Sequence, residues 1–252
     1  DLTQTTGDAR YPEKISIRSY QPTYEGHPGQ IRRAMKLIAS AKKPVVYTGG
    51  GIISSEASSE LVRFCEKLSL PVVNTLMGLG GFPGNHDLFL GMLGMHGTYA
   101  ANMAITHCDL IVAIGARFDD RATGKVDEFA PHAKIIHVDI DPTSISKSIR
   151  VDVPIVGDSK FVLKRMLQIL DDEKDLFSSH PSLTSHWLKE IHEWKSGYPL
   201  TYVRDGSLKP QFVIERIFEL TKGKAVISTE VGQNQMWTAQ FFKFLKPRTI
   251  LT

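Results

Sequence analysis

The fold is decided by the stretch Val45-Val46-Tyr47-Thr48-Gly49-Gly50-Gly51. Its apolar residues predict a short strand, and the glycine run predicts a turn into a helix over residues 54–68. The same unit recurs outward along the chain. Further strands are predicted at 71–75, 109–114, 134–138 and 153–156, and further helices at 30–41, 98–106 and 159–170. Because each of these five strands is an unbroken apolar run between helices, we expect an α/β fold with an open, parallel, doubly wound sheet.

The pattern changes beyond residue 171. Residues 171–181 are charged and are expected to form a linker. A helix is predicted at 183–194, with an inner face of Trp187, Leu188, Ile191 and Trp194. After an irregular stretch at 195–210, the chain predicts an incomplete second α/β unit. Its helices are expected at 211–220 and 233–244, and its strands at 225–229 and 249–251.

Composition limits the function classes that fit the chain. Of 252 residues, 42% are hydrophobic and 23% are charged, with a net charge of +3, which argues against disorder, collagen and coiled coil. The longest basic runs are pairs such as Arg32-Arg33, so nucleic-acid binding is not expected. No apolar stretch approaches the ~20 residues of a membrane span. Cys65 and Cys108 lack a CxxC partner, which favours reduced thiols in a cytoplasmic protein over a disulfide or a zinc site.

Both ends of the sequence look cut. The chain begins at Asp1 in a polar segment without Met, and it stops at Thr252 directly after a strand-like run. Residues 1–27 hold prolines and glycines but no apolar periodicity. We therefore expect an interior piece of a longer soluble protein.

Glycines and polar residues gather where the predicted strands end, and ligands of open parallel sheets bind beyond those ends. A glycine run such as Gly49-Gly50-Gly51 lets backbone N–H groups approach a phosphate. Arg117 offers a two-pronged donor for a pyrophosphate, and Asp139 can accept both hydroxyls of a ribose. The other polar strand ends are 75–81 and Gly157-Asp158. Together they predict a dinucleotide laid across the sheet edge.

Each of these features also has a purely structural explanation. The glycine run is not a GxGxxG fingerprint and can be a tight turn. Asp139 and Asp141 can cap a helix before Thr143, and Asp158 can cap the helix that begins after it. Arg117 can form a surface ion pair. The cluster Asp119-Asp120-Arg121 favours a salt-bridged loop over the rim of an active site.

Residues 91–98 favour a ligand-contacting loop, because three glycines in seven positions argue against a core helix. His96 has no identifiable acid or base partner there and is expected to position a ligand. No nucleophile–base pair and no metal-ligand spacing is found. The residues by themselves predict a dinucleotide-binding α/β domain and no reaction.

Several long motifs, in a fixed order, resemble the large catalytic subunits of the acetolactate synthase (acetohydroxyacid synthase) family, which depend on thiamine diphosphate. The motifs lie at 75–80, 91–99, 115–121, 137–142 and 230–237, and the resemblance covers essentially the whole chain. Family members have three α/β domains. The resemblance implies an interdomain connector at 1–27, a Rossmann-like central FAD-binding domain at 28–172, a helical linker at 173–208, and the truncated start of the thiamine-diphosphate domain at 209–252.

The resemblance also implies roles for individual residues. FAD would be held by Gly49, Gly50, Gly51, Thr75, Leu76, Met77, Leu93, Met95, His96, Gly97, Arg117, Asp139, Ile140, Gly157 and Asp158. Thiamine diphosphate would meet Val231, Gly232 and Gln233. Asn234 stands where the family usually has His. Asp120 and Arg121 would face the substrate channel.

The family reaction condenses two pyruvates, or pyruvate and 2-ketobutyrate, to 2-acetohydroxy acids with release of CO2, in branched-chain amino acid biosynthesis. Thiamine diphosphate with Mg²⁺ carries this transferase chemistry, and FAD is largely structural. The family's catalytic Glu and its Gly-Asp-Gly…Asn motif are not found in this sequence, so we expect no catalytic residue, no metal site and no activity in the isolated chain. The resemblance further implies a homo-oligomer of large subunits with a small regulatory subunit.

Two other functions fit parts of the sequence. Another flavin-containing thiamine enzyme, such as glyoxylate carboligase or pyruvate oxidase, shares the domain order. It is not expected to match both Asp119-Asp120-Arg121 and Gly94-Met95-His96-Gly97. A non-catalytic nucleotide-binding or scaffold module would not need Arg117, Asp139 and intact glycines at its strand ends.

Overall fold

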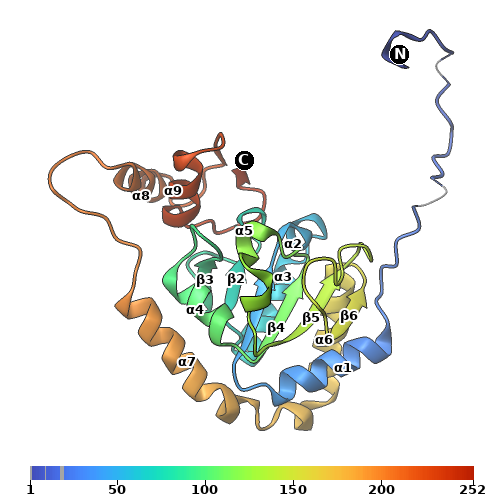
Figure 1. Ribbon diagram of the computed structural model, residues 1–252, viewed down its shortest axis with the longest axis horizontal. Coiled ribbons are helices and arrows are strands. Elements are labelled where there is room, and N and C mark those ends of the chain that lie inside the picture. Colours follow the sequence, from blue (N-terminus) through green and yellow to red (C-terminus); the bar gives the residue numbers. More distant parts are fainter. Residues whose placement is uncertain (1, 9, 18–19) are drawn as a thin grey trace.

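The computed structural model describes residues 2–8, 10–17 and 20–252, and its centre is a parallel six-stranded sheet (Figure 1). The strands lie in the order β3-β2-β1-β4-β5-β6. Their bounds are β1 Pro44–Thr48, β2 Val72–Asn74, β3 Phe89–Met92, β4 Leu110–Ile114, β5 Lys134–Asp139 and β6 Val153–Val156. The order reverses between β1 and β4, which confirms the predicted doubly wound α/β fold.

Helices cover both faces of this sheet (Figure 1). One core joins the sheet to α1 (Pro28–Ser40), α3 (Ser58–Leu68) and α6 (Ser159–Asp172). The opposite core joins it to α4 (Tyr99–His107) and α7 (His180–Gly197). Within β1, Val46 faces the first core, whereas Val45 and Tyr47 face the second. The strands read as unbroken apolar runs because both of their faces are buried.

α7 belongs to this central body. The buried Trp187 indole N–H donates to the Pro44 carbonyl at 3.1 Å, and Ile191 is also buried. Lys43, the residue before β1, pairs through its Nζ with Glu190 at 2.9 Å. Leu188 and Trp194, predicted to face inward, are only half-buried. They lie at the edges of the buried face of α7, whose centre is formed by Trp187 and Ile191.

Three predictions for the central body were wrong. The single helix expected at 54–68 is two helices, α2 (Gly50–Ser54) and α3, because Glu56 adopts a left-handed conformation at φ 55° and turns the chain between them. A sixth strand, β3, was missed because Gly91 interrupts its apolar pattern at a register shift against β2. The linker expected at 171–181 is largely ordered, with a 3₁₀ turn at Lys174–Phe177 between α6 and α7.

A smaller unit follows α7 and lies over the β3 side of the sheet (Figure 1). It consists of α8 (Pro210–Thr221), β7 (Ile227–Ser228), α9 (Gln233–Phe241) and β8 (Ile250–Leu251), with β7 and β8 paired in parallel. Phe242 and Phe244 form a small core with Leu79 and Met92 of the central body. The Gly84 N–H donates to the Phe244 carbonyl at 2.8 Å. The two units therefore share an apolar interface.

The remaining segments are short. A four-residue helix, α5, spans Asp120–Thr123, and 3₁₀ turns span Leu2–Gln4, Leu76–Gly78 and Val126–Glu128. Most of the described residues before α1 extend away from the sheet (Figure 1), but the Tyr24 carbonyl accepts from the Asp158 N–H at 2.8 Å. Within the described ranges, no helix combines the length and the hydrophobicity needed to cross a membrane.

Candidate functional site

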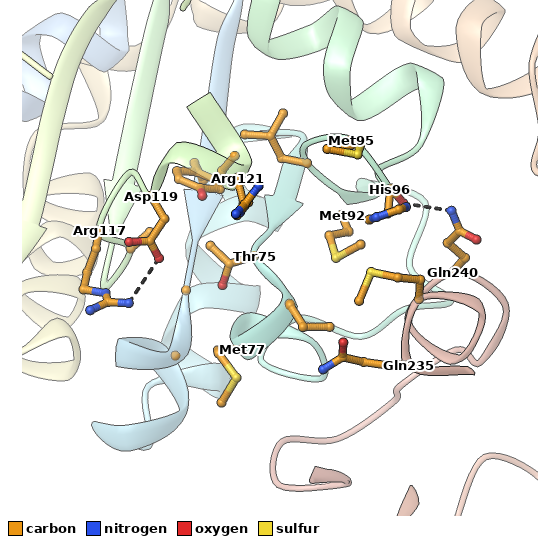
Figure 2. A pocket seen from close by; sticks show the side chains of 18 of the residues that line it. Thr75, Met77, Met92, Met95, His96, Arg117, Asp119, Arg121, Gln235 and Gln240 are labelled. Carbon is orange, nitrogen blue, oxygen red and sulfur yellow. Dashed lines mark hydrogen bonds and ion pairs between the residues drawn. The ribbon is translucent and has the colours of Figure 1, made fainter. Parts of the chain in front are cut away.

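A cavity of about 1290 Å³ lies beyond the carboxyl ends of β1 and β4. The sheet order reverses between these two strands, so the loops that follow them leave toward opposite faces and open a crevice. Figure 2 shows the cavity between the loops of the central sheet and α9 of the smaller unit. Residues of both units therefore line one space.

The floor of the cavity is made by the close approach of two loops. An ideal Cβ on Gly49 would lie 2.3 Å from the Gly115 carbonyl oxygen, and one on Gly51 would lie 2.5 Å from Gly115 Cα. The amides of Gly49 and Gly51 donate to the carbonyls of Ile114 and Gly115 at 3.2 and 3.1 Å. These two glycines therefore let the β1 and β4 loops meet, and their N–H groups serve the fold. A Cβ on Gly50 would make only ordinary contact, 3.4 Å from Met77 Cβ.

One wall of the cavity is apolar and rich in methionine. Met77, Met92 and Met95 surround the space in Figure 2, with Leu76, Leu93 and Met236 alongside them. Met95 is 78% exposed and Met77 is 59% exposed. Exposed apolar side chains that gather in one patch mark a ligand or partner surface more often than scattered ones do. Flexible thioether side chains suit a flat aromatic ligand.

The opposite wall is charged. Arg117 pairs with Asp119 at 3.1 Å, and Arg121 also lines the cavity (Figure 2). The guanidinium of Arg117 is largely exposed to the cavity. The surface ion pair that the sequence allowed is thus present, and it lies on the cavity wall. Asp120 is not among the residues that line the cavity.

Beneath this wall, buried polar groups surround Phe118, which adopts a left-handed conformation at φ 54°. Its ring packs against Tyr47 at 5.5 Å and edge-on against His137 at 5.2 Å. The Tyr47 hydroxyl is buried and has no hydrogen-bond partner among the described residues. Burial, with a smaller contribution from Asp119, raises the pKa of Tyr47 above its ordinary value. Tyr47 therefore stays a neutral phenol.

The segment 93–98 is held as a tight loop at the rim. The Asn102 side chain accepts from the Gly94 N–H at 3.0 Å and donates to the Gly94 carbonyl at 3.1 Å. Leu93, Met95 and His96 line the cavity, whereas Gly97 does not and closes the turn through its N–H to the Gly94 carbonyl. The Gln240 amide of α9 donates to the His96 carbonyl at 2.9 Å (Figure 2). This bond ties the smaller unit to the loop.

The strand ends of β5 and β6 are arranged differently. Asp139 lines the cavity, but Ile140, Gly157 and Asp158 do not. Asp158 caps α6 by accepting from the N–H groups of Lys160 and Phe161 at 2.9 and 3.3 Å, as its structural explanation predicted. A ligand contact by Ile140, Gly157 or Asp158 stays a prediction.

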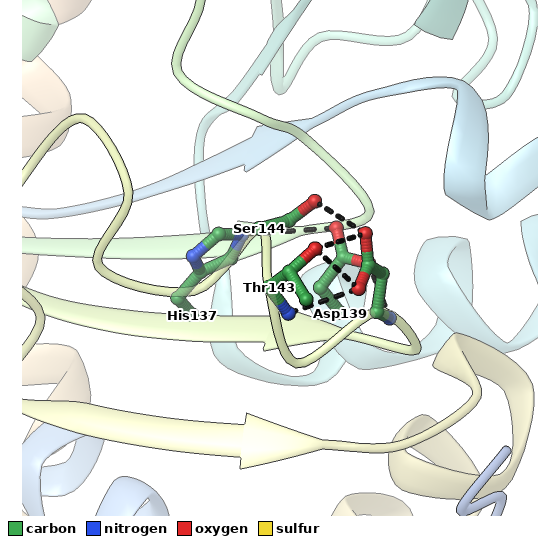
Figure 3. A network of polar contacts seen from close by, with 5 residues as sticks. His137, Asp139, Thr143 and Ser144 are labelled. Carbon is green, nitrogen blue, oxygen red and sulfur yellow. Dashed lines mark hydrogen bonds and ion pairs between the residues drawn. The ribbon is translucent and has the colours of Figure 1, made fainter. Parts of the chain in front are cut away.

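Asp141 acts as a turn residue. It accepts from the Thr143 hydroxyl at 2.8 Å, from the Thr143 N–H at 2.9 Å and from the Ser144 hydroxyl at 3.1 Å, and these bonds, the Thr143 hydroxyl's first, lower the pKa of its carboxyl (Figure 3). No helix begins at Thr143 in this described segment, so helix capping by Asp139 or Asp141 was wrong.

The sequence reasoning missed part of the lining. Val231, Gly232 and Gln233 were predicted, but α9 also contributes Gln235, Met236, Trp237 and Gln240. Gln233, Met236, Trp237 and Gln240 follow helical spacing and so share one face, a signal that the sequence did contain. Tyr47 and Met92 were missed because they lie within buried strands. Across residues 2–8, 10–17 and 20–252, no three His, Cys, Asp or Glu side chains gather to hold a metal ion.

A large cavity at the switch point of a doubly wound sheet, with one apolar wall and one charged wall, defines a cofactor-binding α/β protein. The chain belongs to the thiamine pyrophosphate enzyme family, because residues 31–166 match the family model described as "Thiamine pyrophosphate enzyme, central domain".

Its relatives carry a more specific name. The chain is 51% identical over 239 residues to an acetolactate synthase large subunit of Buchnera aphidicola subsp. Schizaphis graminum. The matched region covers 94% of this chain and 41% of that protein. It is 48% identical over 241 residues to the acetolactate synthase isozyme 3 large subunit of Escherichia coli, with the same coverage of 94% and 41%. A probable acetolactate synthase large subunit of Methanocaldococcus jannaschii is 47% identical over 249 residues, covering 95% and 41%. The chain thus spans about two fifths of the length of these relatives.

Proposed function

We propose that this chain is the central portion of an acetolactate synthase large subunit. The whole protein would condense two pyruvates, or pyruvate and 2-ketobutyrate, to 2-acetohydroxy acids with release of CO2. The observation that carries the proposal is the shared cavity, in which the central sheet and α9 of the smaller unit line one space of about 1290 Å³. A site built from both units suits an enzyme whose two cofactors lie in neighbouring domains.

The lining of this cavity fits FAD. The methionine wall, with Met77, Met92 and Met95, would take the flat isoalloxazine ring. The exposed guanidinium of Arg117 would donate to the phosphates of FAD as well as to Asp119. Asp139 would accept the ribose hydroxyls. Within residues 20–252, the Gly49 and Gly51 amides bond to protein carbonyls, so Gly50, which also lines the cavity, would be the glycine of this run whose amide serves the ligand.

Thiamine diphosphate would meet the smaller unit. Val231, Gly232 and Gln233 line the cavity at the start of α9, and the Asn234 side chain accepts from the Gln235 N–H at 2.9 Å. When bound, thiamine diphosphate supplies a carbanion-stabilising ylid. The described residues do not fit Mg²⁺, since no carboxylate cluster lies near these positions. We infer that the metal site and the activating Glu belong to parts of the whole protein outside this chain.

The remaining assignments extend the proposal to the whole protein. Residues 28–172 would form its central domain, with a connector at 1–27, a helical linker at 173–208 whose α7 packs against that domain, and the start of the thiamine-diphosphate domain at 209–252. Asp120 and Arg121 would face the channel for 2-keto acids. The large subunits would form an oligomer with a small regulatory subunit. Another flavin-containing thiamine enzyme is not favoured, because the relatives reported above are named acetolactate synthases.

Titration of the chain with FAD, followed by flavin fluorescence, tests this proposal, with NAD as the control ligand. We expect micromolar FAD binding that Arg117→Ala and Asp139→Ala each weaken about tenfold, as loss of a charged hydrogen bond would do. Arg165→Ala and Asp172→Ala, at exposed positions of α6, are the matched controls and should leave binding unchanged. A folded chain that binds NAD more tightly than FAD, or that binds neither, would contradict the proposal. The isolated chain should show no carboligase activity.

A further inference from the structure

His137 is a buried polar residue that the proposed function leaves without a role. It lies in β5, and its side chain is fully buried. Neither ring nitrogen makes a hydrogen bond of normal geometry in the described part of the chain, although the Ala116 backbone lies close enough to raise the pKa of the ring. Buried polar groups normally find partners, because an unpaired donor or acceptor loses its bonds to water without replacement. An orphaned imidazole next to a ligand cavity therefore calls for an explanation.

The nearest charged group is Asp139. Side chains two residues apart on a strand point to the same face, and His137 Nε2 lies 3.8 Å from Asp139 Oδ2 (Figure 3). The other carboxylate oxygen, Oδ1, accepts from the Asp141 N–H at 2.9 Å. Asp139 is thus anchored on one side, lines the cavity, and presents its second oxygen toward the imidazole.

The surroundings keep this imidazole in place and neutral. The Phe118 ring lies edge-on against it, with an angle of 86° between the planes. Burial lowers the pKa of His137 from its ordinary value, although Asp139 and the Ala116 backbone act in the opposite direction. A neutral imidazole has one N–H donor and one acceptor nitrogen. Only an Nε2–H can face the Asp139 carboxylate without repulsion between lone pairs.

We propose that His137 is a positioning residue for Asp139. Its Nε2–H points at Oδ2 and sets the angle at which the carboxylate meets the ribose hydroxyls of the nucleotide cofactor. The separation of 3.8 Å is too long for a hydrogen bond, and it closes by a small rotation of the carboxylate when the ligand binds. The ligand side of this inference rests on the proposed function, whereas the His137–Asp139 pair itself exists without ligand.

A double-mutant cycle tests the ligand side. His137→Leu removes the donor and should weaken FAD binding about tenfold, whereas His137→Gln, which keeps a donor near Nε2, should stay within about threefold of wild type. In an Asp139→Asn background, His137→Leu should cause no further loss, because its partner charge is already gone. An equal loss in both backgrounds, or a Gln variant as weak as the Leu variant, would overturn the inference.

His180→Leu is the matched control. His180 is also buried, lies in α7, and has its Nε2 3.2 Å from the Leu68 carbonyl, away from the cavity. Its removal should lower the thermal midpoint and leave the FAD dissociation constant unchanged. If His180→Leu weakens FAD binding as much as His137→Leu does, the effect is one of general stability and the inference is wrong.

A measurement without ligand separates this inference from the proposed function. Long-range ¹H–¹⁵N spectra of the wild-type chain at neutral pH report which ring nitrogen of His137 carries the proton. The inference requires the Nε2–H tautomer, and an Nδ1–H tautomer would overturn it. A chain that shows Nε2–H but binds no FAD would refute the flavin proposal and leave the His137–Asp139 pair standing.

Discussion

The strand ends of β4 and β6 have similar sequences and different structures. Gly115-Ala116-Arg117 follows β4, and Gly157-Asp158 follows β6, so each pairs a glycine with a charged residue. After β4 the chain continues as a loop that lines the cavity, with Arg117 among the lining residues. After β6 the chain enters α6 at once, and Asp158 caps that helix. The comparison teaches that the next element decides whether a glycine and a charge serve a ligand or a helix.

The largest effect is expected where the β1 and β4 loops touch. Gly49→Ala should destabilise the chain by about 3 kcal/mol, because the added Cβ would lie 2.3 Å from the Gly115 carbonyl. Gly50→Ala is the neighbouring control, since its Cβ meets nothing closer than 3.4 Å, and its stability should change little. Urea unfolding followed by circular dichroism measures both. Equal losses would mean that the close approach of the loops is not what requires glycine.

The next largest effect is expected when FAD binding and stability are both measured for one variant at each of the two strand ends. Arg117→Ala should weaken FAD binding about tenfold with little change in stability, because its ion pair is exposed. Asp158→Ala should lower the free energy of unfolding by about 1 kcal/mol through loss of the α6 cap. FAD titration measures the binding of both variants, and urea unfolding measures their stability. If Asp158→Ala instead weakens FAD binding as strongly as Arg117→Ala, both strand ends serve the ligand.

Two groups near these strand ends, Tyr47 in β1 and Asp141 after β5, should make stability respond to opposite ends of the pH range. The pKa of Tyr47 is raised by burial, so the unfolded chain loses this proton near pH 10 while the folded chain keeps it. The contribution of Tyr47 to the free energy of unfolding is therefore complete below pH 10, and it falls by about 1.4 kcal/mol per pH unit above pH 10. The difference between wild type and Tyr47→Phe isolates this slope from Cys65 and Cys108, whose pKa values burial also raises. Parallel stability curves above pH 10 would contradict it.

The smallest effect concerns Asp141, beyond β5. Hydrogen bonds from Thr143 and Ser144 lower its pKa, so its contribution to stability is present above pH 3.8 and is lost as the pH falls further. Asp141→Asn should therefore flatten the acid side of the stability curve slightly and leave the alkaline side unchanged. Urea midpoints between pH 2.5 and 5 measure this. If the stability of Asp141→Asn falls more steeply than that of wild type as the pH is lowered, the prediction is contradicted.

The sequence predicted the parallel sheet well because its signal is local. Val45-Val46-Tyr47 and the strands like it are apolar on both faces, and such continuous apolar runs can be recognised from the sequence alone. β3 was not predicted, since Gly91 breaks its pattern and its pairing with β2 is set by contacts distant in sequence. The break between α2 and α3 was not predicted either, because the left-handed conformation of Glu56 is rare for a residue of this type and has no signal in the sequence.

The site was predicted in outline for a similar reason. Glycines and charges at strand ends could be placed once the sheet order was assumed, and Arg117 and Asp139 do line the cavity. Tyr47 and His137 could not be found this way, because each lies inside an apolar strand where a polar group looks like ordinary core. Only the three-dimensional arrangement around Phe118 brings them together.

Hydrogen–deuterium exchange of the chain with and without FAD tests the central claim most directly, because it reports where the ligand lies in both units at once. The account predicts slower exchange in peptides covering 49–54, 115–123 and 231–240, with no change in α8, which does not line the cavity. Protection confined to the central sheet, with none at 231–240, would contradict a site shared by the two units.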